Sequence, residues 1–329
     1  MARSLVTGAS GFLGGYVVST LASRGDPVRA LVRKTSNIAD LEALGIEIVT
    51  GDLNDEESLA RAVDGVQRVF HCAGYVSDWG AWEDFQRVNV TGLQILLRVL
   101  AKSNVTRFVH VSTSGVYGHP NKPVDESFPH RFRGLPYLDT KIIGEQLVWD
   151  FFRTCQIPTS IVRPVAIYGP GSITLVKDIA DYLVSGSMVL IGKGDKPAGL
   201  AYVSNVADLM LLAAESDNSI GQSYNAQDDT NITWGQYVKA LANILGVREP
   251  RIHIPYRLAY AAGYAMEKTY RMFGRSGRPL LTRNAVDFLG TCQGFPIAKA
   301  RKELGYEPAI NFQEGMVRIR AWLHDEGYC

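Results

Sequence analysis

Two side chains four residues apart, Tyr137 and Lys141, could carry out acid–base chemistry. They begin a predicted helix that continues through Phe151, and residues four apart share one face of a helix. A tyrosine hydroxyl is a poor acid or base at neutral pH, because its reference pKa is about 10. A nearby ammonium group stabilises the phenolate and lowers that pKa. The spacing is common on helices, so its meaning depends on the residues around it.

A cluster of hydroxyl groups, Ser-Thr-Ser at residues 112–114, follows a predicted strand at residues 108–111. Thr113, or its neighbour Ser112, could donate a hydrogen bond to a carbonyl oxygen. This hydroxyl and Tyr137 would then both meet the negative charge that develops on that oxygen. The set suits the reduction of a ketone by a nicotinamide cofactor.

A glycine-rich turn at residues 7–14 lies between a predicted strand at residues 3–6 and a predicted helix. This order is the context that a dinucleotide fingerprint requires. Gly8 would let the chain turn off the strand, Gly11 would let a pyrophosphate approach the backbone, and Gly14 would let the helix pack closely on the sheet. The helix N-terminus supplies free N–H groups for the phosphates. The cofactor contacts predicted in the turn are Gly8, Ser10, Gly11, Phe12, Leu13 and Gly14.

Predicted strands alternate with helices along the first half of the chain, which indicates a parallel sheet covered on both faces. The strands are expected at residues 27–32, 46–49, 66–71, 108–111 and 159–162, and a helix is expected to open at Asn89. We therefore predict an α/β, Rossmann-type doubly wound domain over residues 1–170. A smaller, mostly helical substrate lobe follows over residues 171–329, with segments at about 200–228 returning to the first domain.

Three further segments are expected to face a cofactor, because ligands of doubly wound sheets collect at the carboxyl ends of the strands. Asp52 would accept a hydrogen bond from the adenine, and the turn at Ala73 and Gly74 would face the cofactor. After the second strand the chain offers Arg33 and Lys34 in place of the acid that would bind a ribose 2′-hydroxyl. Cations suit a 2′-phosphate, so Arg33 favours NADP over NAD, although NAD stays possible. The alternative is that Arg33 and Lys34 are ordinary surface cations that contact no cofactor.

Residues 75–82 are candidates for substrate contact because they follow the predicted fourth strand. Trp79 and Trp82 could line a flat apolar site. The alternative is that they only cover the next helix. Val76 and Tyr168 are further candidates for contact with a substrate.

The composition excludes several classes of protein. The 329 residues are 46% hydrophobic, 20% charged and carry a formal net charge of +1, so nothing favours a nucleic-acid partner. Cys72, Cys155, Cys292 and Cys329 show no metal spacing and read as free thiols of a reducing, cytoplasmic compartment. No secretory signal fits before the first strand. The apolar stretch at residues 258–266 is too short to span a bilayer, which leaves contact with a membrane surface or a cap over an apolar pocket.

Taken together, these motifs resemble the extended short-chain dehydrogenase/reductase family over nearly the whole chain. The matching segments are residues 7–14, 51–53, 89–92, 112–118, 137–141 and 163–170. The resemblance implies a Rossmann domain with a substrate lobe, a catalytic pair of Tyr137 and Lys141, and a Ser/Thr partner that falls on Thr113 with Ser112 next in line. It also implies cofactor contacts at Leu53, Asn89 and Pro164, and a homodimer formed through the helices that flank the catalytic pair.

Within the family, residues 202–207, 258–266 and 295–306 look like the 3β-hydroxysteroid dehydrogenase branch, and residues 31–33 also look like dihydroflavonol-reductase-type enzymes. The leading hypothesis is an NADP(H)-dependent oxidoreductase that interconverts a secondary alcohol and a ketone on a bulky apolar substrate of the steroid, sterol or 3-oxo acyl type. The alternative is a nucleotide-sugar epimerase or dehydratase that recycles bound NAD, in which Lys193, Lys196 or Arg251 would contact a diphosphate. A non-enzymatic NADP(H)-binding protein is the third hypothesis, but relatives of that kind usually lose the Tyr/Lys pair.

Overall fold

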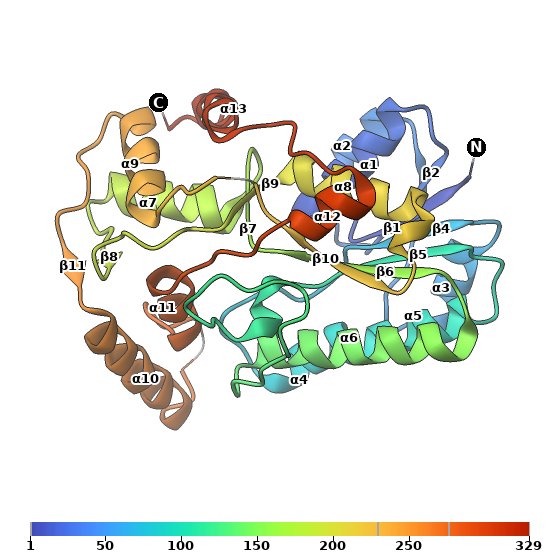
Figure 1. Ribbon diagram of the computed structural model, residues 1–329, viewed down its shortest axis with the longest axis horizontal. Coiled ribbons are helices and arrows are strands. Elements are labelled where there is room, and N and C mark those ends of the chain that lie inside the picture. Colours follow the sequence, from blue (N-terminus) through green and yellow to red (C-terminus); the bar gives the residue numbers. More distant parts are fainter. Residues whose placement is uncertain (1, 229, 276, 329) are drawn as a thin grey trace.

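A seven-stranded parallel sheet forms the centre of the protein (Figure 1). The computed structural model describes residues 2–228, 230–275 and 277–328. The strand order is β10-β6-β5-β4-β1-β2-β3, and all six pairings are parallel. The predicted Rossmann-type fold is therefore confirmed. The strands are β1 (Ser4–Thr7), β2 (Val28–Val32), β3 (Glu47–Thr50), β4 (Arg68–His71), β5 (Arg107–Val111), β6 (Thr159–Pro164) and β10 (Gln222–Ala226).

Helices cover both faces of this sheet, as the uninterrupted burial of its inner strands requires. On one face α1 (Phe12–Ser23) packs beside α8 (Val203–Glu215). On the other face lie α3 (Glu56–Val63), α5 (Leu93–Leu100) and α6 (Pro136–Cys155). Each face has its own hydrophobic core.

The remaining strands and helices lie outside the seven-stranded sheet. Two short parallel pairs stand outside the main sheet: β7 (Ala166–Tyr168) with β9 (Leu200–Tyr202), and β8 (Leu190–Ile191) with β11 (His253–Ile254). The other helices are α2 (Ala39–Ala43), α4 (Trp82–Phe85), α7 (Asp178–Val184), α9 (Trp234–Leu245), α10 (Tyr256–Met272), α11 (Arg283–Gly290), α12 (Ala298–Leu304) and α13 (Phe312–Asp325).

The helix expected to open at Asn89 begins earlier, at Trp82. Between α4 and α5 the backbone makes a π-helical turn, Gln86–Gly92, so Asn89 lies in the middle of a continuous helical segment. Its side chain is used in a tertiary contact and caps nothing. The Oδ1 atom accepts from the backbone N–H of Tyr75 at 2.7 Å, and the Nδ2 atom donates to the Tyr75 carbonyl and to Thr140. This π turn therefore fixes the segment that follows β4, a placement typical of functional sites.

Three of the four cysteines, Cys72, Cys155 and Cys292, are free thiols. Cys329 lies outside the described residues. Within the described parts of the chain, no helix is long and apolar enough to cross a bilayer.

A buried ion pair joins β6 to α6. Arg163 donates to both carboxylate oxygens of Glu145, at 2.8 and 2.6 Å, and both residues are buried. Burial alone would raise the pKa of Glu145, but the guanidinium of Arg163 lowers it well below its usual range. Arg163 also donates to the Tyr117 hydroxyl, which in turn donates to Asn225 on β10. The network thus connects β6 and β10, the last two strands at one edge of the sheet, to the helix that carries Tyr137.

We expect Glu145→Gln to lower the free energy of unfolding by about 3 kcal/mol, because it leaves the buried Arg163 charge without its partner. Urea unfolding followed by circular dichroism measures this change. Glu56→Gln is the matched control, because Glu56 pairs with Arg98 and Lys102 at the surface, and we expect it to cost less than about 1 kcal/mol. Equal effects of the two substitutions would contradict the importance of the buried pair.

Candidate active site

The turn between β1 and α1 depends on glycines that touch backbone. Gly8 has φ +70°, and a Cβ atom there would lie 2.7 Å from the Ala73 nitrogen. A Cβ atom at Gly14 would lie 2.1 Å from the Gly8 carbonyl oxygen, far inside van der Waals contact. At Gly11 the closest atom would be the same oxygen at 3.2 Å. Gly8 and Gly14 are therefore required for the turn to close against itself and against the turn after β4.

The N-terminus of α1 is suited to an anion. Gly11 is its N-cap, with no side-chain hydrogen bond to the first turn, and that turn contains no acidic residue. Ser10 and Gly11 are exposed, so the free N–H groups of the first turn are accessible. Phe12 is partly buried, and Leu13 packs into the core, so Leu13 offers only its backbone. A pyrophosphate fits this helix end.

The turn after β4 lies close to α6, and two further predicted cofactor residues follow or end other strands. A Cβ atom on Gly74 would lie 3.4 Å from Asn89 Oδ1 and 3.5 Å from Lys141 Nζ, so the turn of Ala73 and Gly74 lies directly beside α6. Leu53 is buried after β3, and Pro164 ends β6. The structure thus brings Gly74, Asn89 and Lys141 together.

Arg33 and Asp52 are exposed at the ends of β2 and β3. The Asn54 backbone N–H chiefly lowers the pKa of Asp52, and the Arg33 charge contributes to the same shift. Both residues follow neighbouring parallel strands, at the edge of the sheet where a Rossmann fold holds an adenosine ribose.

Tyr137 and Lys141 occupy the first two turns of α6. Burial raises the pKa of Tyr137 to about 12, partly offset by a hydrogen bond from Thr113. Lys141 donates from Nζ to the Val111 carbonyl at 2.9 Å, and burial lowers its pKa to about 8. Lys141 is not among the groups that lower the pKa of Tyr137 here, so its expected tuning of the tyrosine stays a prediction. Ser112 is buried behind this set and its hydroxyl has no hydrogen-bond partner.

Neutral side chains surround the buried end of Lys141. The rings of His71 and His110 stack with centroids 5.3 Å apart, and burial lowers the pKa of His71 to about 3 and that of His110 well below its usual range. Burial likewise raises the pKa of the Cys72 thiol to about 12. Lys141 is therefore the charged member of this group at neutral pH.

A small hollow lies beside Tyr137, and Trp79 forms part of it. The Trp79 ring meets Tyr270 edge to face at 6.2 Å and carries the Arg271 guanidinium 5.3 Å from its centroid. Asp78 anchors this segment by accepting from Arg278 and Thr282. The hollow is lined by Asp78, Trp79, Gly80, Phe85, Leu135, Pro136, Tyr137, Glu267, Arg271 and Asn284.

The other predicted substrate residues lie elsewhere. Trp82 begins α4, and its indole N–H donates to Gln86 in the same helical segment. This agrees with the alternative that Trp82 covers the helix after residues 75–82. Val76 is 70% exposed. Tyr168 is fully buried and packs against Tyr202, so no surface of its side chain is open to a substrate in this structure. Its strand, β7, turns inward to pair with β9, which motif spacing could not reveal.

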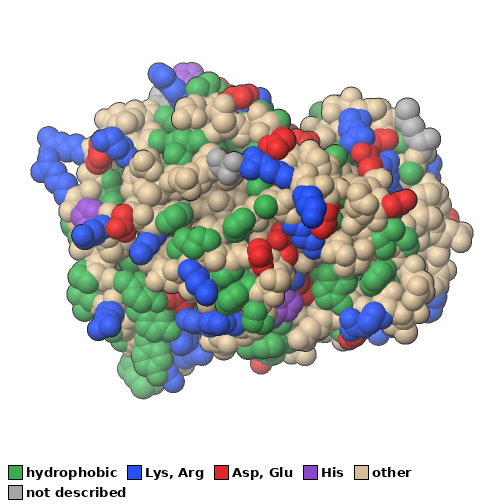
Figure 2. Space-filling model, in the orientation of Figure 1, with side chains coloured by type: hydrophobic (Ala, Val, Ile, Leu, Met, Phe, Trp, Pro, Cys, Tyr) green, Lys and Arg blue, Asp and Glu red, His purple; other side chains and the backbone are tan. Residues whose placement is uncertain are grey.

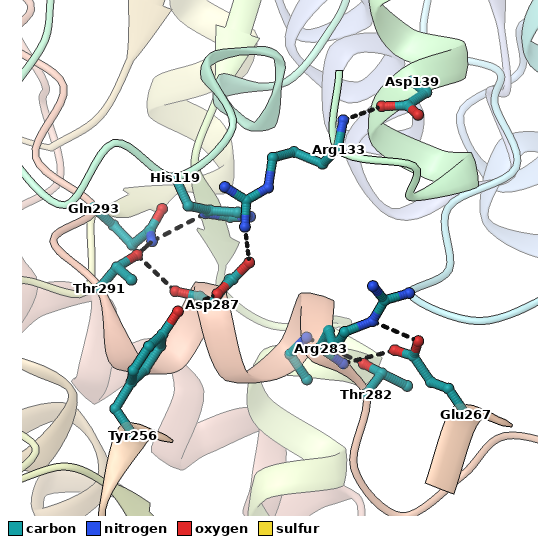
Figure 3. A network of polar contacts seen from close by, with 11 residues as sticks. His119, Arg133, Asp139, Tyr256, Glu267, Thr282, Arg283, Asp287, Thr291 and Gln293 are labelled. Carbon is teal, nitrogen blue, oxygen red and sulfur yellow. Dashed lines mark hydrogen bonds and ion pairs between the residues drawn. The ribbon is translucent and has the colours of Figure 1, made fainter. Parts of the chain in front are cut away.

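A polar network joins the segment before α6 to α11 (Figure 3). Arg133 donates from its backbone N–H to Asp139 on α6 and from its guanidinium to Asp287 on α11, each at 2.9 Å. Asp287 is buried and also accepts from the Tyr256 hydroxyl at 2.6 Å. His119 extends the network through Gln293. The C-terminal helices are thus tied to the helix that carries Tyr137.

Sequence reasoning missed this network and the C-terminal side of the hollow. Asp287 and Asn284 lie about 150 positions after Tyr137, and no spacing links them to it. His119 alone carried a local signal, because it directly follows the predicted motif at residues 112–118.

The comparison with known proteins agrees with this geometry. The sequence model described as the NAD dependent epimerase/dehydratase family matches residues 4–226. The chain belongs to this family. It is an extended short-chain dehydrogenase/reductase, as its motifs predicted, and an NAD(P)-dependent oxidoreductase that acts on a CH–OH group.

Individual relatives match over almost their whole length. A farnesyl-dihydroquinoline-oxide ketoreductase of Stigmatella aurantiaca is 32% identical and covers 97% of this chain and 96% of its own. A 3 beta-hydroxysteroid dehydrogenase/Delta 5-->4-isomerase of Mycobacterium tuberculosis is 31% identical, with 96% and 89% covered. The crystal structure of gox2253 is 29% identical, with a TM-score of 0.83 and coverage of 100% and 99%.

We expect Gly14→Ala to weaken cofactor binding at least about tenfold, because the added methyl group would displace the Gly8 carbonyl and open the phosphate turn. Fluorescence titration with NADPH and NADH measures the two dissociation constants. Gly15→Ala is the matched control: its Cβ atom would meet only the Ala9 carbonyl oxygen at 3.5 Å, an ordinary contact. A Gly14→Ala protein that binds cofactor as Gly15→Ala does would contradict this account of the turn.

Proposed function

We propose that this protein is an NADP(H)-dependent oxidoreductase that interconverts a secondary alcohol and a ketone on a bulky, largely apolar substrate. The observation that carries the proposal is the place of Tyr137 in the lining of an aromatic hollow, one helical turn before the buried Lys141, with Thr113 acting to lower the pKa of Tyr137. A ketone oxygen placed between the two hydroxyl groups would receive two hydrogen bonds as its negative charge develops.

Each residue of the set has a separate role in the proposed reaction. The nicotinamide, when bound, supplies or accepts the hydride. Tyr137 gives its proton to the ketone oxygen in reduction and removes it in oxidation, and Thr113 orients that oxygen. Lys141 holds the nicotinamide ribose, and its ammonium group stabilises the phenolate that Tyr137 becomes. A pKa near 8 for Lys141 supports this assignment, because it leaves the amine mostly charged at neutral pH.

The names of the relatives support an apolar substrate. Two related proteins, from Shewanella oneidensis and Stenotrophomonas maltophilia, are named 2-alkyl-3-oxoalkanoate reductases, and others are named for a farnesyl-bearing quinoline oxide and for 3 beta-hydroxysteroids. These compounds share an oxygen-bearing carbon beside a large hydrocarbon group. Trp79, Phe85 and Leu135 in the hollow would contact a group of that kind.

We expect Tyr137→Phe to reduce kcat at least about a thousandfold while the dissociation constant for the cofactor changes less than about threefold, because only the proton donor is removed. Turnover is measured with 3-hydroxysteroids and 3-oxo acyl compounds, and binding by titration. Tyr182→Phe, at an exposed site on α7, is the control and keeps wild-type turnover. Full activity of Tyr137→Phe would refute the assignment.

The preference for NADP rests on Arg33. Its exposed guanidinium at the end of β2 would contact a 2′-phosphate, and the segment offers no acid for a 2′-hydroxyl. We expect Arg33→Ala to weaken NADPH binding at least about tenfold and to change NADH binding less than about twofold. Arg61→Ala, a surface cation on α3, serves as the control. An equal loss for both cofactors, or no loss for either, would contradict the role of Arg33.

A nucleotide-sugar epimerase or dehydratase remains the second candidate, because the sequence model that matches this chain is described as the NAD dependent epimerase/dehydratase family. Its diphosphate contacts were expected at Lys193, Lys196 or Arg251, and these do not belong to the hollow beside Tyr137. Nucleotide released on denaturing the purified protein discriminates the two. Stoichiometric NAD, with activity on nucleotide sugars and no net coenzyme consumption, would favour the epimerase.

We also propose that the protein forms a homodimer through α5 and α6 and lies in the cytoplasm. The boundary between the Rossmann domain and the substrate lobe is proposed at residue 170. The partly buried Ile143 and Leu147 on α6 are available for such a dimer contact. Sedimentation equilibrium measures the oligomeric state directly.

A further inference from the structure

One segment, residues 251–283, has a charge balance unlike that of the whole protein. It contains seven Lys and Arg residues and a single acid, Glu267, which gives a formal net charge of +6 against +1 for the entire chain. Two of the seven cations are neutralised in ion pairs, Arg278 by Asp78 and Arg283 by Glu267. The other five are exposed: Arg251, Arg257, Lys268, Arg271 and Arg275.

The same segment exposes large apolar side chains. Met272 is 73% exposed, Leu280 71% and Phe273 66%, and Leu258, Ile252 and Tyr264 are exposed as well. Such a concentration of exposed apolar groups marks an interaction surface, whereas single exposed apolar residues are normal. We call the exposed cations and apolar side chains of residues 251–275 and 277–283 the basic-apolar surface.

Helix α10 organises this surface. Its inner stripe is Ala259, Gly263 and Glu267, each four residues from the next, and it packs against the start of α11. A Cβ atom at Gly263 would lie 3.1 Å from the backbone of Thr282, so the two segments are in close contact. By the helical period, the opposite face carries Arg257, Leu258, Tyr264, Lys268 and Met272.

The position of α10 leaves this outer face uncovered. The helix stands at the lower left edge of the molecule, away from the main sheet (Figure 1). In the same orientation, Figure 2 shows hydrophobic side chains projecting at that corner with Lys and Arg beside them. The surface is therefore both prominent and accessible.

We propose that the basic-apolar surface docks the protein on an anionic lipid bilayer, with α10 lying along the interface. Apolar side chains such as Met272 and Phe273 would enter the boundary between headgroups and acyl chains, while Arg257 and Lys268 would meet the phosphates. Charge complementarity favours this occupant. A second copy of the surface would bring like charges together, and a purely apolar partner would leave five cations unmatched.

The docked orientation places α10 between the bilayer and the hollow at Tyr137. Glu267 on the inner stripe of α10 and the exposed Arg271 at the side of the helix line that hollow. An apolar substrate dissolved in the bilayer would reach the site around the edge of α10. The docking itself goes beyond the proposed function and does not depend on the substrate.

Co-sedimentation of the full chain with vesicles tests the proposal. We expect binding to vesicles of phosphatidylcholine and phosphatidylglycerol, weak binding to phosphatidylcholine alone, and loss of binding as salt is raised. The double variant Met272→Asp/Phe273→Asp should lower the partition coefficient at least about tenfold, because it removes the inserted apolar groups and adds repulsive charge. Arg257→Glu/Lys268→Glu should lower it by a similar factor.

The controls are Val317→Asp and Arg320→Glu on α13, which make the same kinds of change on an exposed helix at another edge of the molecule. They should leave vesicle binding within about twofold. Thermal unfolding of every variant shows whether it is folded. No binding by the wild-type protein, equal binding to both vesicles, or equal effects of patch and control variants would overturn the proposal. So would a dimer in sedimentation equilibrium that the patch variants dissociate without any effect on lipid.

Discussion

Contact between backbone segments without intervening side chains is the constraint on which this structure depends. Gly14 lies against Gly8, and Gly8 lies against Ala73, each at a distance that admits no Cβ atom. These contacts bring the first turn of α1 next to the turn after β4. Gly74 then approaches Asn89 and Lys141, so the glycine-rich turn and helix α6 are held together through four positions that carry little or no side chain.

Burial sets the acid–base properties of Tyr137 and Lys141. Tyr137 is held as a neutral hydroxyl by a raised pKa, while the pKa of Lys141 is lowered because its ammonium group is enclosed with neutral histidines and a neutral thiol. The two shifts have opposite directions but one cause, the loss of water around the charged form. The ammonium group rests on the Val111 carbonyl at 2.9 Å. A group that binds between Lys141 and Gly74 would compete with that carbonyl, so the electrostatics of the pair depend on what occupies the site.

Local sequence predicted the parts of the site that come from strand ends. The glycine turn, Thr113 and the Tyr137–Lys141 pair follow strands whose order is fixed by the doubly wound topology, so their approach could be expected from spacing alone. Asn89 was correctly expected in a helix, but its π turn and its clamp on Tyr75 were not, because a π turn has no distinct sequence period. Tyr168 was a candidate for substrate contact, yet β7 pairs with β9 and the Tyr168 side chain is buried.

The C-terminal helices could not be placed from sequence because their contacts depend on long-range pairing of buried polar groups. Asp287 is enclosed and must be hydrogen-bonded, and it receives Arg133 and Tyr256 from distant segments. Arg133 in turn is tied through its backbone to Asp139, two residues from Tyr137. Displacement of α10 and α11 by a lipid surface or a substrate would therefore reach the first turn of α6 through hydrogen bonds already present. The helices that line the hollow beside Tyr137 also carry the exposed cations and apolar side chains, so a ligand in the hollow and a partner at that surface would contact the same elements.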